Sequence, residues 1–191
     1  MIQRIDHVSI AVRDYDKALD FFTRILGAIP GSFARDDHMR YVWRINSLGD
    51  LSRLELIAPT GAGSFLDGFL KNREGGVHHI TLQTPDIDHA RKVLEDNAIP
   101  YFGYNEYPGG VWKEIFIHPR HAFGVLIQIA QFTADDWLSD SVRMPAGKVF
   151  TVEKTAEGCR LALAHPGGGT MTCELSKDDA CSLIESLQRI L

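Results

Sequence analysis

Apolar and polar residues alternate along residues 4–12 of the chain. One face of this segment carries Val8, Ile10 and Val12, and the other carries His7, Ser9 and Ala11. A period of two is typical of a half-buried strand. The segment is therefore predicted to be the first strand of the fold.

A helix is predicted next, because apolar residues recur at helical spacing from Ala18 to Leu26. Asp14 or Asp16 can cap the N-terminus of this helix, and Gly27 suits its end. Both capping candidates stay open at this point.

The chain repeats this pattern once. Residue 5 corresponds to residue 77, so that His7 corresponds to His79 and Asp14 to Asp86. The first copy predicts the strand at 4–12, the helix, and strands at 39–46 and 51–58 that are joined by a turn over 46–50. The second copy predicts a strand at 77–84, a helix at 86–97 and strands near 100–105, 111–117 and 123–130. Each copy is read as one βαβββ module.

Residues 132–191 have no counterpart in the repeat. Strands are predicted near 148–154, 159–165 and 170–175, with a turn over 167–169, and Ser176 opens a helix whose acidic first turn suits the helix dipole. We therefore expect an α+β protein. Its repeat domain spans 1–131, made of modules 1–60 and 75–131, and a small C-terminal β/α extension of unassigned role spans 132–191.

Composition excludes several classes of function. The chain has 191 residues and a formal net charge of −5, which argues against a nucleic-acid backbone binder. Charges interrupt the N-terminal segment, and no apolar run is long enough to span a membrane, so neither secretion nor membrane insertion is expected. The three cysteines form no CxxC pair, which favours reduced thiols and a cytoplasmic location.

The first and last strands of each copy place a polar side chain at related positions. These are His7 and Glu55 in the first copy, and His79 and Gln128 in the second. Imidazole and carboxylate suit Zn²⁺, Ni²⁺, Co²⁺, Mn²⁺ or Fe²⁺. A lone strand histidine is more often a structural residue, and that reading stays open for each histidine, but the repetition favours a divalent metal site.

Several segments of the chain resemble the vicinal oxygen chelate (glyoxalase/bleomycin resistance/dioxygenase) superfamily. They are IDHVSIAV, LELIAPTG, GGVHHITLQT and HPRHAFGVLIQI, while FLDGFLKNREGGVHHI is similar to the methylmalonyl-CoA epimerase branch. The resemblance covers about residues 1–131. It implies two βαβββ modules that form a curled mixed sheet around a metal cleft, with the ligands His7, Glu55, His79 and Gln128.

The ligand set departs from the epimerase branch at two positions. Epimerases of this type usually carry glutamine at the Glu55 position and glutamate at the Gln128 position, whereas bacterial glyoxalases carry glutamate at both. The chain thus keeps one carboxylate and one amide, but their positions are exchanged, so the carboxylate lies on the other side of the cleft from its place in epimerases.

The resemblance implies a metal-dependent isomerase that acts by enolisation on an acyl-CoA or similar small-molecule carbonyl substrate. Glu55 is the expected base, and Asp37 is the expected second acid, with Asp36 and His38 as competitors in the same loop. A solvated loop explains Asp36 and Asp37 equally well. Tyr41, Trp43 and Trp112 lie in predicted strands that could line the cleft, but a role as core aromatics is favoured.

Three other functions stay open. Glu55 is compatible with a glyoxalase-like lactoylglutathione lyase, and two histidines with a glutamate are compatible with a non-haem iron dioxygenase. A protein that binds a small molecule such as an antibiotic without catalysis is the alternative from another class, although such binders generally lack the metal ligands. A homodimer is expected, with the 132–191 extension at its interface or over an open sheet edge.

Overall fold

The computed structural model describes residues 1–49, 52–165 and 167–191. Two compact units divide the chain, at Met1–Ser139 and Asp140–Leu191. Residue 50 of the predicted turn and residue 51 of the predicted strand lie outside the described residues. Within the described ranges, no helix is long and apolar enough to cross a membrane.

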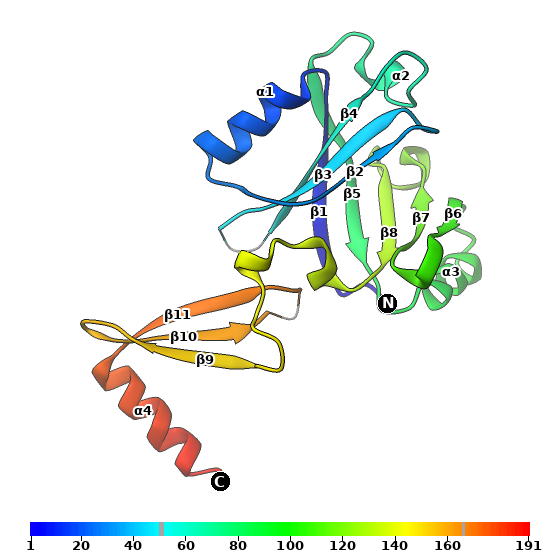
Figure 1. Ribbon diagram of the computed structural model, residues 1–191. Coiled ribbons are helices and arrows are strands. Elements are labelled where there is room, and N and C mark those ends of the chain that lie inside the picture. The colour runs from blue at the N-terminus through cyan, green and yellow to red at the C-terminus, as the bar shows by residue number, and fades with distance from the viewer. Residues whose placement is uncertain (50–51, 166) are drawn as a thin grey trace. The chain divides into compact units, whose positions relative to one another are not determined.

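An eight-stranded mixed sheet forms the first unit and curls from one edge to the other (Figure 1). Its strands are β1 (Arg4–Val12), β2 (Ile29–Asp36), β3 (Tyr41–Ser47), β4 (Arg53–Pro59), β5 (Gly75–Gln83), β6 (Phe102–Glu106), β7 (Lys113–Ile117) and β8 (Ile127–Gln131). The spatial order is β2-β3-β4-β1-β5-β8-β7-β6. β1 and β5 pair antiparallel, and each pairs in parallel with the last strand of its own module, β4 or β8. The repeat predicted from the sequence is confirmed as two four-stranded halves of one sheet.

The sequence pattern does not predict the strand β2. It contains Pro30 and Gly31, and none of its residues is fully buried. Proline is tolerated at the edge of a sheet, where its missing N–H faces outward. As an edge strand β2 therefore needs no clean alternation, which explains why the pattern did not reveal it.

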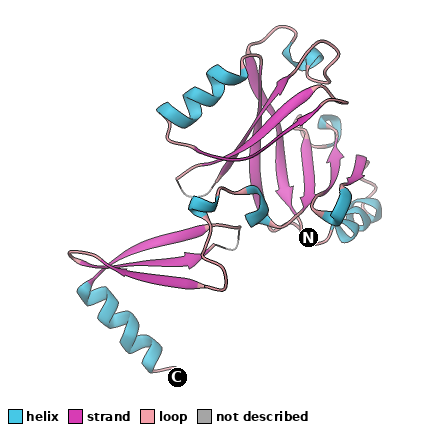
Figure 2. Ribbon diagram, in the orientation of Figure 1, coloured by secondary structure: helices cyan, strands magenta, loops and turns pink. Residues whose placement is uncertain are grey.

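Helices follow the first strand of each module (Figure 2). α1 (Tyr15–Asp20) continues into a π-helical turn, η1 (Phe21–Ile25), and α3 (Ile87–Asp96) is its counterpart. Asp14, not Asp16, caps α1 by accepting a hydrogen bond from the backbone N–H of Lys17, and Asp86 caps α3 in the same way. Gly27 follows at φ +74°, which ends the first helix as expected.

Two buried clusters hold the first unit together. The larger packs α3 against β7 and β8 through Ile87, Ala90, Leu94, Ile115, Ile117 and Ile129. The smaller joins Ala11 and Ile57 to Leu66 and to Leu70 of the short helix α2 (Asp67–Leu70). Ala11 lies on the same face of β1 as His7, and both are almost fully buried. The polar face of β1 is therefore an interior face.

Four short 3₁₀ helices complete the connections of the described chain: η2 (Pro108–Gly110), η3 (Pro119–His121), η4 (Ala134–Trp137) and η5 (Asp140–Val142). The helix η4 belongs to the first unit and packs against β2 at Gly31. A Cβ atom at Gly31 would lie 2.6 Å from the carbonyl oxygen of Trp137, so this close approach requires glycine.

The second unit is a three-stranded antiparallel sheet with one helix. Its strands β9 (Phe150–Lys154), β10 (Gly158–Ala164) and β11 (Thr170–Ser176) lie in the order β11-β10-β9, and α4 (Lys177–Gln188) follows. Ser176 and Asp179 form a reciprocal capping box at the start of α4. The three strands and the helix start predicted from the sequence are confirmed.

Candidate metal centre

Glu55 and His79 approach each other because both pair with Ser9 of β1, Glu55 from β4 and His79 from β5. Oε2 of Glu55 lies 3.6 Å from Nε2 of His79 and 3.7 Å from Nε2 of His7. Ligand atoms of the three side chains all lie within 4.8 Å of one another. Because nitrogen and carboxylate ligands stand about 2.0–2.2 Å from a metal such as zinc, one ion can contact all three.

Two of these ligand atoms have no partner of their own. Oε2 of Glu55 and Nε2 of His79 are both buried, and neither atom forms a hydrogen bond. Leaving a buried polar atom unpaired costs about 1–3 kcal/mol, so native proteins rarely do so without a reason. A divalent cation between the two side chains would satisfy both atoms. The donor set and its unpaired atoms therefore fit a metal ion.

His7 is held in the form that can bind a metal. Its Nδ1 donates a hydrogen bond to Oδ2 of Asp6 at 2.7 Å, which directs Nε2 toward the other two side chains, where Oγ1 of Thr81 lies 2.8 Å from it. Burial by itself would raise the pKa of Asp6, but the hydrogen bond from His7 and the charges of Arg53 and Arg4 outweigh it and lower that pKa. Asp6 is therefore a stable anion behind His7.

Burial shifts the titration of the other two ligand candidates. It raises the pKa of Glu55, a rise that His7 opposes and Glu114 adds to. It lowers the pKa of His79 well below the usual value, with the charges of His7 and His78 adding to the effect. His79 is thus neutral, which is the ligand form of imidazole.

Gln128 reaches the centre from β8, opposite Thr81 of β5. Its Oε1 accepts a hydrogen bond from Oγ1 of Thr81, which also lies 2.8 Å from Nε2 of His7. Its Nε2 donates to Oε2 of Glu114 at 2.6 Å. The amide oxygen of Gln128 is therefore the end of the side chain that lies beside His7.

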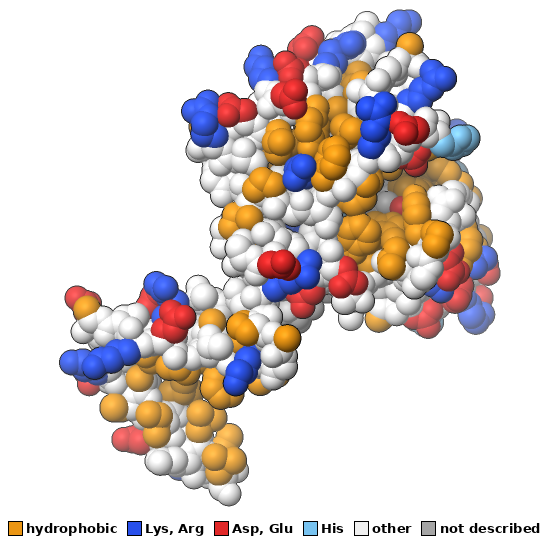
Figure 3. Space-filling model, viewed as in Figure 1, with side chains coloured by type: hydrophobic (Ala, Val, Ile, Leu, Met, Phe, Trp, Pro, Cys, Tyr) orange, Lys and Arg blue, Asp and Glu red, His pale blue; other side chains and the backbone are white. Residues whose placement is uncertain are grey.

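A pocket of about 460 Å³ contains His7, Glu55 and Gln128 in its lining. This volume lies within the usual range for small-molecule sites. Apolar and aromatic side chains form much of the remaining wall: Ala34, Tyr41, Trp43, Ile45, Tyr107, Val111, Trp112 and Trp137. Figure 3 shows hydrophobic side chains gathered around a hollow on this face of the first unit.

The aromatic side chains of the wall contact one another. The ring of Trp137 lies 5.5 Å from that of Trp43 and 5.2 Å from that of Trp112, centre to centre. Trp112 in turn stacks on Phe132 at 4.4 Å. Tyr41 and Trp43 of β3 pack against the smaller buried cluster and also line the pocket, so the expectation of core aromatics is confirmed for these two. Trp112, just before β7, belongs to neither cluster and lines the pocket.

The end of β2 and the loop after it lie at the pocket, with Asp36 half-buried and Asp37 exposed. The side chain of Asp37 is 82% exposed and forms an ion pair of 2.6 Å with Arg35, while Asp36 accepts a hydrogen bond from the backbone N–H of Met39. Asp36 and Asp37 both contribute to the pocket lining. The acid role of Asp37 stays a prediction.

Three residues of the site were not assigned a role from the sequence: Asp6, Thr81 and Glu114. The repeat held a signal for Asp6, because it corresponds to His78 in the second copy. Nδ1 of His78 lies 2.9 Å from Nδ1 of His79, so each copy places a partner for the candidate ligand imidazole just before it. For Glu114, the correspondence between the two copies gives no such signal.

Comparison with known proteins adds to this geometry. Residues 6–115 match the model of a family described as the glyoxalase/bleomycin resistance protein/dioxygenase superfamily. The chain is 37% identical over 131 residues to mitochondrial methylmalonyl-CoA epimerase of Homo sapiens, covering 67% of this chain and 73% of that one. It is 35% identical over 134 residues to an ethylmalonyl-CoA/methylmalonyl-CoA epimerase of Cereibacter sphaeroides, covering 69% and 99%.

The solved structures agree with these relatives. A crystal structure of methylmalonyl-CoA epimerase from Mycobacterium tuberculosis superposes with a TM-score of 0.63 at 25% identity and covers 69% of this chain and 89% of that one. The family match contains the strands that carry His7, Glu55 and His79. The chain belongs to the glyoxalase/bleomycin resistance protein/dioxygenase superfamily.

Proposed function

We propose that this chain is a metal-dependent epimerase of acyl-CoA thioesters of the methylmalonyl-CoA type. The observation that carries the proposal is the cluster of His7, Glu55 and His79 at the pocket, with unpaired ligand atoms on Glu55 and His79. The similarity to two epimerases at 35% and 37% identity supports the choice of reaction and substrate.

Inversion at the α-carbon of a thioester requires a base that removes a proton and an acid that returns one to the opposite face. His7, Glu55, His79 and Gln128 would hold a divalent ion, which when bound would supply Lewis-acid stabilisation of negative charge on the carbonyl oxygen of the thioester. Glu55 is the proposed base. It carries the one carboxylate of the cluster and lines the pocket, so it can face a bound substrate.

The acid on the opposite face is assigned to Asp37, as the sequence predicts. Its exposure at the pocket allows it to approach a bound substrate without the cost of a buried charge. Burial raises the pKa of Tyr107 to about 12, with the charge of Glu114 adding to the rise. Its phenol therefore stays protonated at the wall of the pocket.

The aromatic wall suits the apolar part of such a substrate. Trp43, Trp112 and Trp137 offer ring surface without charge, which can hold an alkyl substituent and exclude water from the reacting carbon. The chemistry of the ligand set, two imidazoles with one carboxylate and one amide, suits several first-row metals equally. The proposal therefore names a divalent ion without choosing among them.

A stereochemical assay tests the function. Protein of known metal content is incubated in deuterated water with one epimer of methylmalonyl-CoA, and both deuterium incorporation at the α-carbon and loss of optical activity are followed. We expect both to occur, and both to disappear after chelation of the metal. Metal-loaded protein that exchanges no α-proton would overturn the proposal.

A second substrate distinguishes the proposed epimerase from its main alternative, a glyoxalase-like lyase. Glu55 stands where the resemblance places a glutamate in bacterial glyoxalases, so the same protein is tested with the hemithioacetal of a 2-oxoaldehyde. Turnover of the hemithioacetal without exchange in methylmalonyl-CoA would assign the chain to the lyases. We expect exchange in the thioester and negligible turnover of the hemithioacetal.

A further inference from the structure

Glu114 is a buried carboxylate at the pocket whose hydrogen-bond partners carry no charge. It lies on β7 and is 7% exposed. Its Oε2 accepts hydrogen bonds from Nε1 of Trp112 at 2.8 Å and from Nε2 of Gln128 at 2.6 Å, and its Oε1 accepts one from Nδ2 of Asn105 at 3.1 Å. In the part of the chain that the structure describes, no ion pair compensates this carboxylate. Such a group is costly to bury, which calls for a function.

The contact with Gln128 decides which end of the amide faces the metal centre. A primary amide has one end that only accepts hydrogen bonds and one that only donates them, whereas an ionised carboxylate only accepts. Glu114 must therefore face Nε2 of Gln128. The opposite end, Oε1, is then the end that accepts from Thr81, whose Oγ1 lies 2.8 Å from Nε2 of His7.

We propose that Glu114 is a positioning residue of the metal centre, which holds the amide of Gln128 with its oxygen toward the ion. Without it, the amide could rotate and present Nε2, which cannot bind a cation. This inference rests on the metal site of the proposed function. It also places a second carboxylate beside the centre, one side chain removed from the ion, so that Glu55 and Glu114 together balance the charge of a divalent cation.

Metal affinity tests the inference directly. Metal-free protein is titrated with Co²⁺, and the dissociation constant is measured by calorimetry and by the visible spectrum of the bound ion. In Glu114→Gln the side chain at 114 can donate as well as accept, so the orientation of Gln128 is no longer selected. We expect Co²⁺ to bind about 10–100-fold more weakly, the usual effect of losing a group that orients a metal ligand.

An exchange of the two side chains separates positioning from packing. In Glu114→Gln/Gln128→Glu the same atoms fill the same space, and the carboxylate at 128 presents an oxygen in either orientation. We expect this double variant to fold and to recover the affinity lost in Glu114→Gln. The control Asn105→Ser removes a donor to Glu114 but leaves the Gln128 contact, and should leave Co²⁺ affinity unchanged.

The outcomes distinguish this inference from the proposed function. If the native protein binds no Co²⁺, the metal site fails and the inference fails with it. If the native protein and Glu114→Gln bind Co²⁺ equally well, the role of Glu114 is overturned while the metal site stands. A folded double variant that stays as weak as Glu114→Gln would also overturn it, because packing alone would then explain the loss.

Discussion

Nδ1 of His7 donates a hydrogen bond of 2.7 Å to Oδ2 of Asp6, and each side chain is 2% exposed. The other oxygen of Asp6 forms ion pairs with Arg53 and Arg4. Asp6 thus connects a ligand of the candidate metal centre to a buried arginine, since the side chain of Arg53 is 1% exposed. The orientation of the imidazole and the compensation of a buried charge depend on one carboxylate.

Replacing Asp6 should therefore destabilise the protein. Asp6→Asn removes the negative charge that compensates Arg53, and breaking a buried pair in this way typically costs about 3–5 kcal/mol. The free energy of unfolding is measured by urea denaturation of metal-free protein. Asp20→Asn is the matched control, because it breaks the exposed pair with Arg24 and should leave stability nearly unchanged. Equal stability of the two variants would contradict the prediction.

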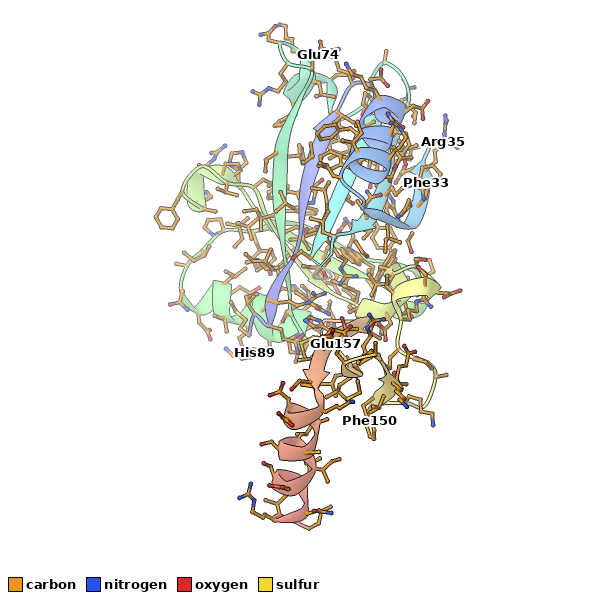
Figure 4. All side chains as sticks on the ribbon, turned by 90° about the vertical axis from the view of Figure 1, so that its left-hand side faces the viewer. Phe33, Arg35, Glu74, His89, Phe150 and Glu157 are labelled. Carbon is orange, nitrogen blue, oxygen red and sulfur yellow. The ribbon has the colours of Figure 1, made fainter. Side chains whose placement is uncertain are left out.

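Loss of either histidine ligand should remove the metal. His7→Ala and His79→Ala each delete one of the clustered ligand atoms, and we expect metal content to fall to background while far-ultraviolet circular dichroism keeps its native shape. Elemental analysis after exhaustive dialysis measures the content. The control His89→Ala alters an exposed histidine of α3, which Figure 4 labels, and should bind metal normally. Undiminished content in both ligand variants would refute the assignment.

Glu55→Gln should retain the fold and lose catalysis. A neutral amide cannot accept the α-proton, so turnover is expected to fall by about two to four orders of magnitude, the scale of a lost general base. Exchange of the α-proton with deuterated water measures the step itself. Exchange at the native rate would remove Glu55 from the role of base.

The same substitution should stabilise the metal-free protein at neutral pH. Burial raises the pKa of Glu55, so the folded state favours its protonated form more than the unfolded state does. Stability linked to this carboxyl is therefore present at low pH and is lost as the pH rises through the raised pKa. Glu55→Gln avoids that loss, so its free energy of unfolding at pH 7 should exceed that of the native protein.

Urea denaturation over a range of pH measures this difference. The gain of Glu55→Gln over the native protein should shrink as the pH is lowered, because protonated Glu55 is neutral as well. A gain that does not depend on pH would point to packing at residue 55 instead of charge.

We expect the protein to form a homodimer in solution. Large apolar side chains between residues 21 and 33 are exposed: Phe21, Ile25, Leu26, Ile29 and Phe33. A second copy could remove them from water, a gain of about 25 cal/mol per Å². Phe33, labelled on β2 with Arg35 in Figure 4, is 47% exposed, and Phe33→Ser should weaken the dimer. Light scattering checks this, and a monomeric mass at micromolar concentration would contradict it.

The internal repeat explains how much of the fold could be predicted. The strands that carry the four polar positions are the first and last of each module, and duplication makes them visible as corresponding residues. The caps Asp14 and Asp86 were visible for the same reason. β2 was not, because an edge strand with proline and glycine keeps no regular alternation.

Glu114 could not be found in this way, since its role depends on pairing between strands. Gln128 pairs with Phe116, so Glu114 lies on the diagonal from Gln128 across β7 and β8. Long side chains on diagonal neighbours can reach each other. The register that makes two residues diagonal neighbours cannot be predicted from the sequence of either strand alone. A glutamate in a predicted strand otherwise indicates a solvent-facing position.

All three tryptophans of the chain, Trp43, Trp112 and Trp137, lie around the one pocket that contains the candidate metal centre. Their emission therefore comes from a single region of the molecule. A thioester or a paramagnetic ion such as Co²⁺ that enters this region should change the intrinsic fluorescence directly, without any added label. Intrinsic tryptophan fluorescence should therefore report whether the pocket is occupied, and the binding of substrates and metals can be followed on the unmodified chain.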